Sequence, residues 1–173
     1  MHLAAVNTYM CEVAGEVADG FLCHAFTTER WIREHSRPAL VEGRRRSGQS
    51  MDGFTVKAAI FLATGTDEQI EAEVGMIREQ LAFYASPPAY RPILELHGWG
   101  DMGAELTRLS KTGRWNEMNH LITDEVVEAF AIVAPVSQVP QILNRRLGDV
   151  VDRVSFLSRT HHPELVAACQ RDS

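Results

Sequence analysis

Apolar residues fall in short runs along the chain, and amphipathic stretches separate these runs, which predicts strands that alternate with helices. Four runs predict strands, at residues 2–6, 21–24, 54–63 and 150–157. The third run is the longest and almost continuously apolar, as expected of a strand that is buried on both faces. Helices between successive strands indicate a parallel sheet with right-handed crossovers.

Capping residues and prolines mark where the predicted helices begin and end. Thr8 is predicted to cap a first helix over residues 8–18. Pro38 lies inside the second helical stretch and predicts either two segments or a kink. Thr66 and Gln69 have the spacing of a capping box, which predicts the start of a long helix before the prolines at 87 and 88.

Residues 89–134 interrupt the alternation, and we interpret them as a helical insertion before the last strand. Short helices are predicted there, over residues 101–110, 115–121 and 124–133. Two more are predicted after it, over residues 139–147 and 163–169. The 173 residues are therefore expected to form a single α/β domain of four β/α units. Such units make either half of an eight-stranded barrel or a small open sheet.

The alternation of strands and helices begins at residue 2, without a preceding segment. A βαβ pattern that starts in this way suggests an architecture that is entered partway through. Parallel α/β folds place their chemistry at the ends of several strands. We therefore expect strands that are absent from this sequence to carry part of any active site.

Composition excludes several classes of protein. Hydrophobic residues make up 45% and charged residues 23%, as in a soluble globular protein. The net charge of -6 argues against a nucleic-acid partner, and no apolar stretch approaches the length of a membrane span. The three cysteines lack C-x-x-C spacing and fit free thiols in a reducing cytoplasm. A cytoplasmic protein without nucleic-acid or membrane partners is expected.

Candidate functional residues follow the predicted strands, because parallel barrels place their chemistry where strands end. Asn7 and Thr8 precede a helix N-terminus, where backbone N–H groups favour a phosphate, although Thr8 is equally suited to capping that helix. His24 ends the second strand and is a candidate for proton transfer or for a hydrogen bond to a cofactor or substrate. A purely structural histidine is the alternative.

The other histidines give weaker signals. His97 stands between leucine, glycine and tryptophan in the insertion, which fits loop packing, a lid or a subunit contact. His161 and His162 have no acidic or cysteine ligand at a suitable spacing, so no metal site is predicted. Taken alone, the residues form no self-contained catalytic constellation.

Several long segments resemble the luciferase-like monooxygenase superfamily, and more narrowly its branch of oxidoreductases that use the deazaflavin coenzyme F420. The segments are residues 2–7 (HLAAVN), 14–20 (AGEVADG), 83–92 (FYASPPAYRP), 96–101 (LHGWGD), 113–118 (GRWNEM) and 151–155 (VDRVS). The resemblance covers nearly the whole chain.

The resemblance implies a TIM (β/α)8 barrel, of which this chain matches the C-terminal half. The predicted strands would then be strands five to eight, and the family's first four strands would have no counterpart here. The resemblance further implies that coenzyme F420, or alternatively FMN, is bound for hydride transfer to or oxidation of a small organic substrate. We predict that Asn7 and Thr8, in a loop that the family uses near the phosphate end of its cofactor, contact the cofactor. His24, nominated by its place at the end of a strand, is predicted to be the catalytic residue.

Two hypotheses for function follow. The chain is either an oxidoreductase domain or a truncated, catalytically inactive half-barrel that acts as an oligomeric interaction module. The oxidoreductase would need a second half-barrel, supplied by a separate N-terminal chain or by another copy in a homo-oligomer. Both hypotheses predict association, because an open half-barrel exposes strand edges and one face of its sheet.

Overall fold

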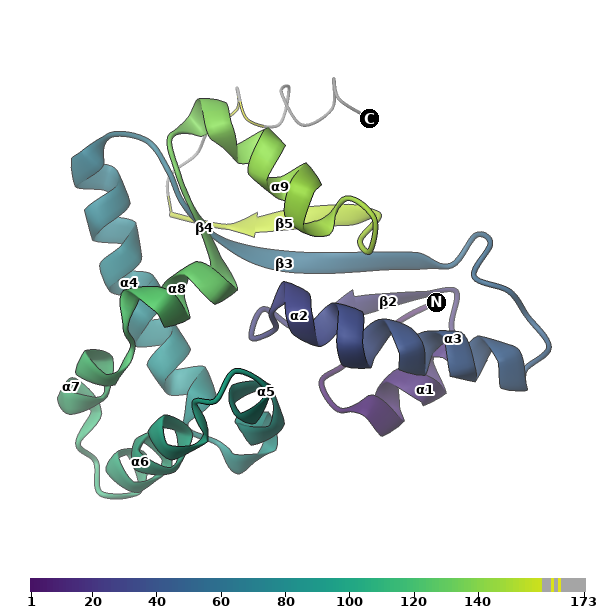
Figure 1. The fold of residues 1–173 in the computed structure, drawn as a ribbon, viewed down its shortest axis with the longest axis horizontal. Helices are drawn as coiled ribbons and strands as arrows, with labels where there is room; N and C mark the ends of the chain where they lie inside the picture. Colours follow the sequence, from purple (N-terminus) through teal and green to yellow (C-terminus); the bar gives the residue numbers. More distant parts are fainter. Residues whose placement is uncertain (160–162, 164, 166–173) are drawn as a thin grey trace.

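The computed structural model describes residues 1–159, 163 and 165, and it has an α/β fold built on a parallel sheet (Figure 1). The strands of this sheet are β1 (His2–Ala5), β2 (Gly20–Cys23), β3 (Thr55–Ala63), β4 (Ala131–Val133) and β5 (Arg153–Leu157). They follow the order β1-β2-β3-β4, and β5 also pairs with β3. The long strand β3 is therefore the centre of the sheet, and every pairing is parallel.

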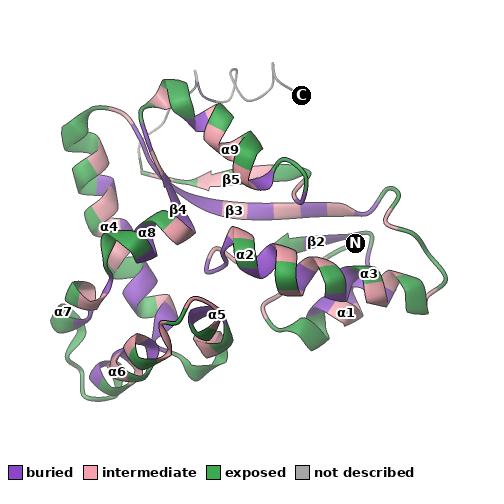
Figure 2. Cartoon of the chain, viewed as in Figure 1, coloured by how far each residue is buried: buried purple, intermediate pink, exposed green. Residues whose placement is uncertain are grey.

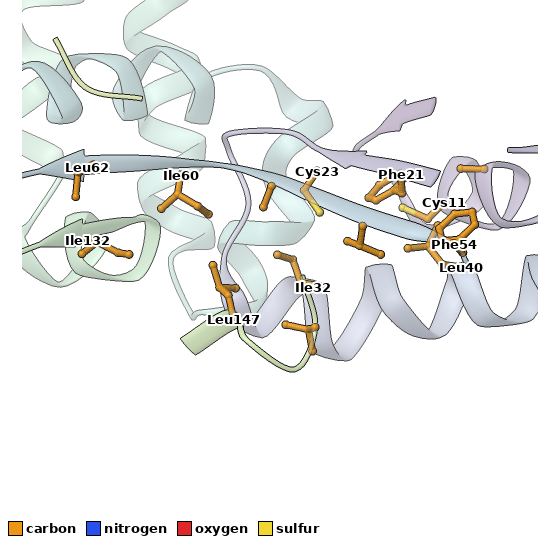
Figure 3. Close-up of a cluster of buried hydrophobic side chains, with 14 of the residues drawn as sticks. Cys11, Phe21, Cys23, Ile32, Leu40, Phe54, Ile60, Leu62, Ile132 and Leu147 are labelled. Atoms are coloured by element: carbon orange, nitrogen blue, oxygen red, sulfur yellow. The ribbon is translucent and has the colours of Figure 1, made fainter. Parts of the chain in front are cut away.

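One face of the sheet is covered by helices and forms the first hydrophobic core. The covering helices are α1 (Thr8–Val17), α3 (Arg37–Arg46) and α9 (Val139–Leu147). Figure 3 shows the side chains of this core, among them Phe21, Leu40, Ile60 and Leu147. Alternate residues of β3 enter this core, as expected of a strand whose side chains point to opposite faces.

A second hydrophobic core lies at the carboxyl end of β3. It is formed by α4 (Asp67–Ala85), α5 (Arg91–Leu96), α6 (Gly100–Lys111), α7 (Trp115–Met118) and α8 (Asp124–Phe130). Phe61 and Ala63 of β3 are buried in it, and Figure 2 shows the buried stripe of α4 that faces the same core. The helices of residues 89–134 thus pack together with α4 rather than on the helix-covered face of the sheet.

Short helical turns connect these elements. They are α2 (Glu29–Trp31), the π-helical segment Ile32–Ser36, and the 3-10 turns Pro88–Tyr90, Asn119–Leu121 and Val136–Gln138. The π-helical segment joins α2 to α3, so the stretch predicted to be broken or kinked near Pro38 is a continuous but irregular helix. Pro38 itself lies in the first turn of α3, where a proline is tolerated.

Several sequence predictions are confirmed, and two are wrong. The helix over 139–147 and the capping box of Thr66 and Gln69 are present. The first helix, however, is capped by Asn7 and not by Thr8, since Asn7 Oδ1 accepts a hydrogen bond from the Met10 N–H at 2.8 Å. The helix predicted over 124–133 ends at Phe130, because residues 131–133 pair with β3 as the additional strand β4. The helix predicted over 163–169 falls largely outside the described residues.

The opposite face of the sheet is open over β1, β2, β5 and the first part of β3. The alternation of side chains places on it His2, Ala4, Gly20, Leu22, Thr55, Lys57, Ala59, Arg153, Ser155 and Leu157. Apart from Gly20, which lies under the His2 side chain, these residues are exposed or half-buried. This open face contrasts with the buried helix-covered face of the same strands.

Candidate functional site

The carboxyl ends of β1 and β2 bring the predicted site residues to one edge of the sheet. Ala5 and Cys23 are partners in the register of these strands, so the loops that carry Asn7 and His24 leave from the same level. Open parallel sheets bind their ligands at this edge. The contact of Asn7, Thr8 and His24 with a cofactor stays a prediction.

The N-terminus of α1 is open to an anionic group. Asn7 and Thr8 are both exposed, and the first turn of the helix contains no acidic residue. The partial positive charge of the helix dipole is therefore not neutralised by a side chain of that turn. The Asn7 amide satisfies one backbone N–H of this turn, that of Met10.

His24 has a defined tautomer because one of its ring nitrogens accepts a backbone hydrogen bond. The Phe26 N–H donates to His24 Nδ1 at 3.0 Å. The proton of the neutral imidazole therefore resides on Nε2. Nε2 lies 3.5 Å from the Tyr90 hydroxyl oxygen, a long contact that leaves this N–H available to a better acceptor.

Two aromatic rings lie beside the His24 imidazole. Its ring centroid lies 5.1 Å from that of Tyr84, in an edge-on arrangement, and 5.4 Å from that of Tyr90. Partial burial lowers the pKa of His24 below its ordinary value. Burial also raises the pKa of Tyr90, so its phenol stays protonated. The arrangement can offer neutral hydrogen-bond donors from the imidazole and the phenol.

Thr64 adds a polar group at the carboxyl end of β3. Its side chain is fully buried, and its hydroxyl oxygen has no hydrogen-bond partner within the described part of the chain. A buried hydroxyl without a partner is uncommon in native proteins and calls for an explanation. Thr64 follows β3, which continues from Ala58, the partner of Cys23, to Ala63, so Thr64 lies beyond the level at which β2 ends and apart from His24.

His97 belongs to the packing of the insertion. Its Nε2 lies 2.8 Å from Thr28 Oγ1, and its ring stacks on Trp99 with centroids 4.6 Å apart. Thr28 is also the N-cap of α2 and accepts the Trp31 N–H. These contacts attach the loop after α5 to the start of α2, which agrees with the loop-packing interpretation of this histidine.

The loop after β5 is fixed by a buried carboxylate. Glu73 Oε1 accepts hydrogen bonds from Ser158 Oγ at 3.1 Å and from the Arg159 N–H at 2.9 Å. His161 and His162 lie outside the described residues. Across residues 1–159, 163 and 165, no group of three or more histidine, cysteine or acidic side chains is arranged to hold a metal ion.

Tyr84 and Tyr90 are site residues that the sequence did not single out. Both lie in the segment 83–92 that carries part of the family resemblance, but in the sequence Tyr84 is only an apolar position of a helix. Their approach to His24 depends on the packing of α4, which carries Tyr84, and of the turn Pro88–Tyr90 against the loop after β2. In the described part of the chain, no helix is both long and apolar enough to cross a lipid bilayer.

Comparison with known proteins supports the family. Residues 1–149 match the model of the luciferase-like monooxygenase family. The uncharacterized protein Rv1360 of Mycobacterium tuberculosis is 44% identical over 171 residues, which are 98% of this chain and 50% of that protein. The 5,10-methylenetetrahydromethanopterin reductase of Methanopyrus kandleri is 26% identical over 155 residues, which are 87% of this chain and 43% of that enzyme.

Solved structures show the same fold. The coenzyme F420-dependent tetrahydromethanopterin reductase of Methanopyrus kandleri superposes with a TM-score of 0.72 at 22% identity, over 98% of this chain and 47% of that one. An F420-dependent secondary alcohol dehydrogenase in complex with an F420-acetone adduct superposes with a TM-score of 0.61 at 11% identity, over 90% and 42% of the two chains.

The chain thus spans about half the length of the curated relatives it matches. Its parallel sheet and covering helices correspond to about half of a luciferase-like TIM-barrel domain. The match of residues 1–149 and the 44% identity to the mycobacterial protein agree with this fold. The chain belongs to the luciferase-like monooxygenase family.

Proposed function

We propose that this chain is the cofactor-binding half of an oxidoreductase that uses coenzyme F420 and acts on a small organic substrate. Two similar structures are of F420-dependent enzymes, which makes F420 the first choice and FMN the alternative. The observation that carries the proposal is the position of His24, whose neutral imidazole keeps an Nε2–H at the carboxyl edge of the sheet.

The residues at this edge fit a deazaflavin. The exposed N-terminus of α1, with Asn7 as its cap, suits an anionic group of the cofactor. The rings of Tyr84 and Tyr90 provide flat apolar surface beside His24. Donors, an anion site and aromatic surface thus lie along one edge.

The bound cofactor supplies the hydride transfer, and the residues of this chain supply binding and orientation. His24 would donate its Nε2–H to an oxygen of the cofactor or substrate. The backbone N–H of Phe26 holds the imidazole in the tautomer that this donation requires. Tyr84 and Tyr90 shield the imidazole from water, which strengthens its hydrogen bonds.

The proposal includes a second half-barrel. One face of the sheet is open over β1, β2, β5 and the first part of β3. The matched relative Rv1360 is about twice as long as this chain. A TIM barrel forms its active site from loops that follow all eight strands. We therefore propose that catalysis requires the four further strands, joined to this chain or supplied by a partner.

Fluorescence titration tests this function. Coenzyme F420 and FMN would each be titrated into the purified chain, alone and together with the half of Rv1360 that lies outside the match. We expect F420 to bind the combined halves, and His24→Phe to weaken binding or turnover by about tenfold or more, because an orienting hydrogen bond is lost. His120→Phe, at an exposed position of the insertion, is the matched control.

Each result decides between the hypotheses. Binding of FMN but not F420 would replace the cofactor and keep the oxidoreductase. Absence of binding under every condition would overturn the oxidoreductase and favour the inactive interaction module. Equal effects of the His24 and His120 substitutions would remove His24 from the site and leave the family assignment intact.

A further inference from the structure

The open face of the sheet carries a row of side chains that crosses four strands. Ala4, Leu22, Lys57 and Arg153 are successive partners in the registers of β1, β2, β3 and β5. Partners in parallel strands point to the same side of the sheet. Two cationic side chains therefore stand next to each other at the β3–β5 end of this row.

Neither cation is neutralised by another side chain in the part of the chain that the structure describes. Within the described residues, the side chains of Lys57 and Arg153 form no ion pair and no hydrogen bond. No position of the open face is acidic, and the nearby Asp152 instead accepts the Val56 N–H at 2.7 Å. A surface that covers this face must therefore supply the counter-charges, because burying unpaired cations is costly.

A second copy of this chain is a poor cover for the open face. It would place another Lys57 and Arg153, and no carboxylate, against the first pair. Like charges brought together at an interface oppose association. The half-length match to the relatives favours instead the other half of such a domain, joined to this chain or supplied by a partner.

We infer that the open face binds a complementary half-barrel whose inward side chains include carboxylates opposite Lys57 and Arg153, and that this face rejects a second copy. The inference rests on the proposed need for a second half-barrel and specifies the chemistry of that partner. The apolar neighbours Ala4 and Leu22 would provide contact area in the same row, while the cations would set partner choice.

Charge reversal tests the inference. The half of Rv1360 outside the match would be co-expressed with the wild-type chain, with Lys57→Glu/Arg153→Glu, or with the control Lys111→Glu/Arg145→Glu, which makes the same charge change at exposed helix positions. We expect the wild type and control to co-purify with the probe. The face variant should bind about tenfold or more weakly, with a loss that shrinks at high salt.

Two further measurements keep the test decisive if the probe does not fold separately. In a fusion of the two halves, the face variant should lower the midpoint of urea unfolding more than the control variant does. In sedimentation of the chain alone, the open face should not mediate a dimer. A wild-type dimer that dissociates in the face variant would overturn the inference. Equal behaviour of the face and control variants in the complex and the fusion would overturn it as well.

Failure of the inference and failure of the proposed function give different results. A charge-dependent complex that binds neither F420 nor FMN would overturn the proposed function and keep the inference. A complex that binds F420 but tolerates charge reversal at Lys57 and Arg153 would overturn the inference and keep the proposed function.

Discussion

At the scale of single residues, His24 shows how local backbone geometry sets chemistry. The sequence placed this histidine correctly after a strand, because the apolar run before it is unambiguous. It did not indicate which nitrogen carries the proton, since that depends on the N–H of Phe26 in the following loop. The neighbouring rings of Tyr84 and Tyr90 come from 60 or more residues further along the chain, beyond the reach of local patterns.

Burial of histidines predicts a loss of stability in mild acid. The pKa values of His24 and His97 lie below the ordinary value of 6.5, chiefly because of burial. Below about pH 6.5 the unfolded chain therefore binds protons that the folded chain does not, so the free energy of unfolding falls as the pH decreases toward the folded pKa values. Urea unfolding of wild type and His24→Asn between pH 7 and 5.5 measures this slope.

The asparagine side chain can still accept the Phe26 N–H, but it does not titrate. We expect the slope to be shallower in His24→Asn than in wild type, with the contribution of His97 remaining. An unchanged slope would contradict the burial of the imidazole.

Two cysteines should resist alkylation in the folded protein. Cys11 and Cys23 are buried in the first hydrophobic core, and burial raises their pKa values to about 11 and about 12. The reactive thiolate is therefore scarce at pH 8. Iodoacetamide labelling followed by peptide mass spectrometry should modify both residues far more slowly in buffer than in urea. Similar rates in both solutions would argue against this core.

At the scale of elements, the closest packing occurs between α1 and α3. A Cβ atom at Gly43 would lie 2.0 Å from the backbone oxygen of Glu12, and one at Gly15 would lie 2.3 Å from that of Leu40. The two helix backbones therefore meet where each carries a glycine. The sequence showed both glycines but not their role, because helix contacts cannot be read from the periodicity of either helix alone.

Alanine substitutions at two helical glycines should have opposite effects. Gly43→Ala forces α1 and α3 apart and should lower the free energy of unfolding by about 1–3 kcal/mol. Gly75 of α4 is exposed, and a Cβ there meets no atom within 4 Å. Gly75→Ala should therefore raise stability by about 0.5–1 kcal/mol through its helix propensity. Urea unfolding of both variants checks the signs, and destabilisation by Gly75→Ala would contradict the exposure of this helix face.

Element boundaries show where sequence patterns succeed and fail. Thr66 and Gln69 predicted the start of α4, because a capping box is a local arrangement of neighbouring residues. Residues 131–133 were predicted to be helical, because they continue an apolar helix pattern, yet they form β4. Their pairing with Phe61, Leu62 and Ala63 depends on a strand about 70 residues away, and tertiary pairing there overrides the local pattern.

At the scale of the whole molecule, one face of the sheet is covered by helices, and the other face is open over β1, β2, β5 and the first part of β3. The alternation of strands and helices predicted the parallel sheet, and the family resemblance predicted its match to half of a TIM barrel. The cationic row of Lys57 and Arg153 became visible only from strand register, because β3 and β5 are almost 100 residues apart.

The central position of β3 has a consequence for how the protein folds. Val56, Ala58, Ile60 and Leu62 enter one core, whereas Phe61 and Ala63 enter the other. Neither core can therefore be completed before the same strand is in place, so the two should form and melt in one cooperative event. The pairing of β3 with β5 closes a loop of almost a hundred residues. We therefore expect this pairing to form late and slowly during folding. The amide hydrogens of β3 should accordingly be among the last in the molecule to exchange with solvent.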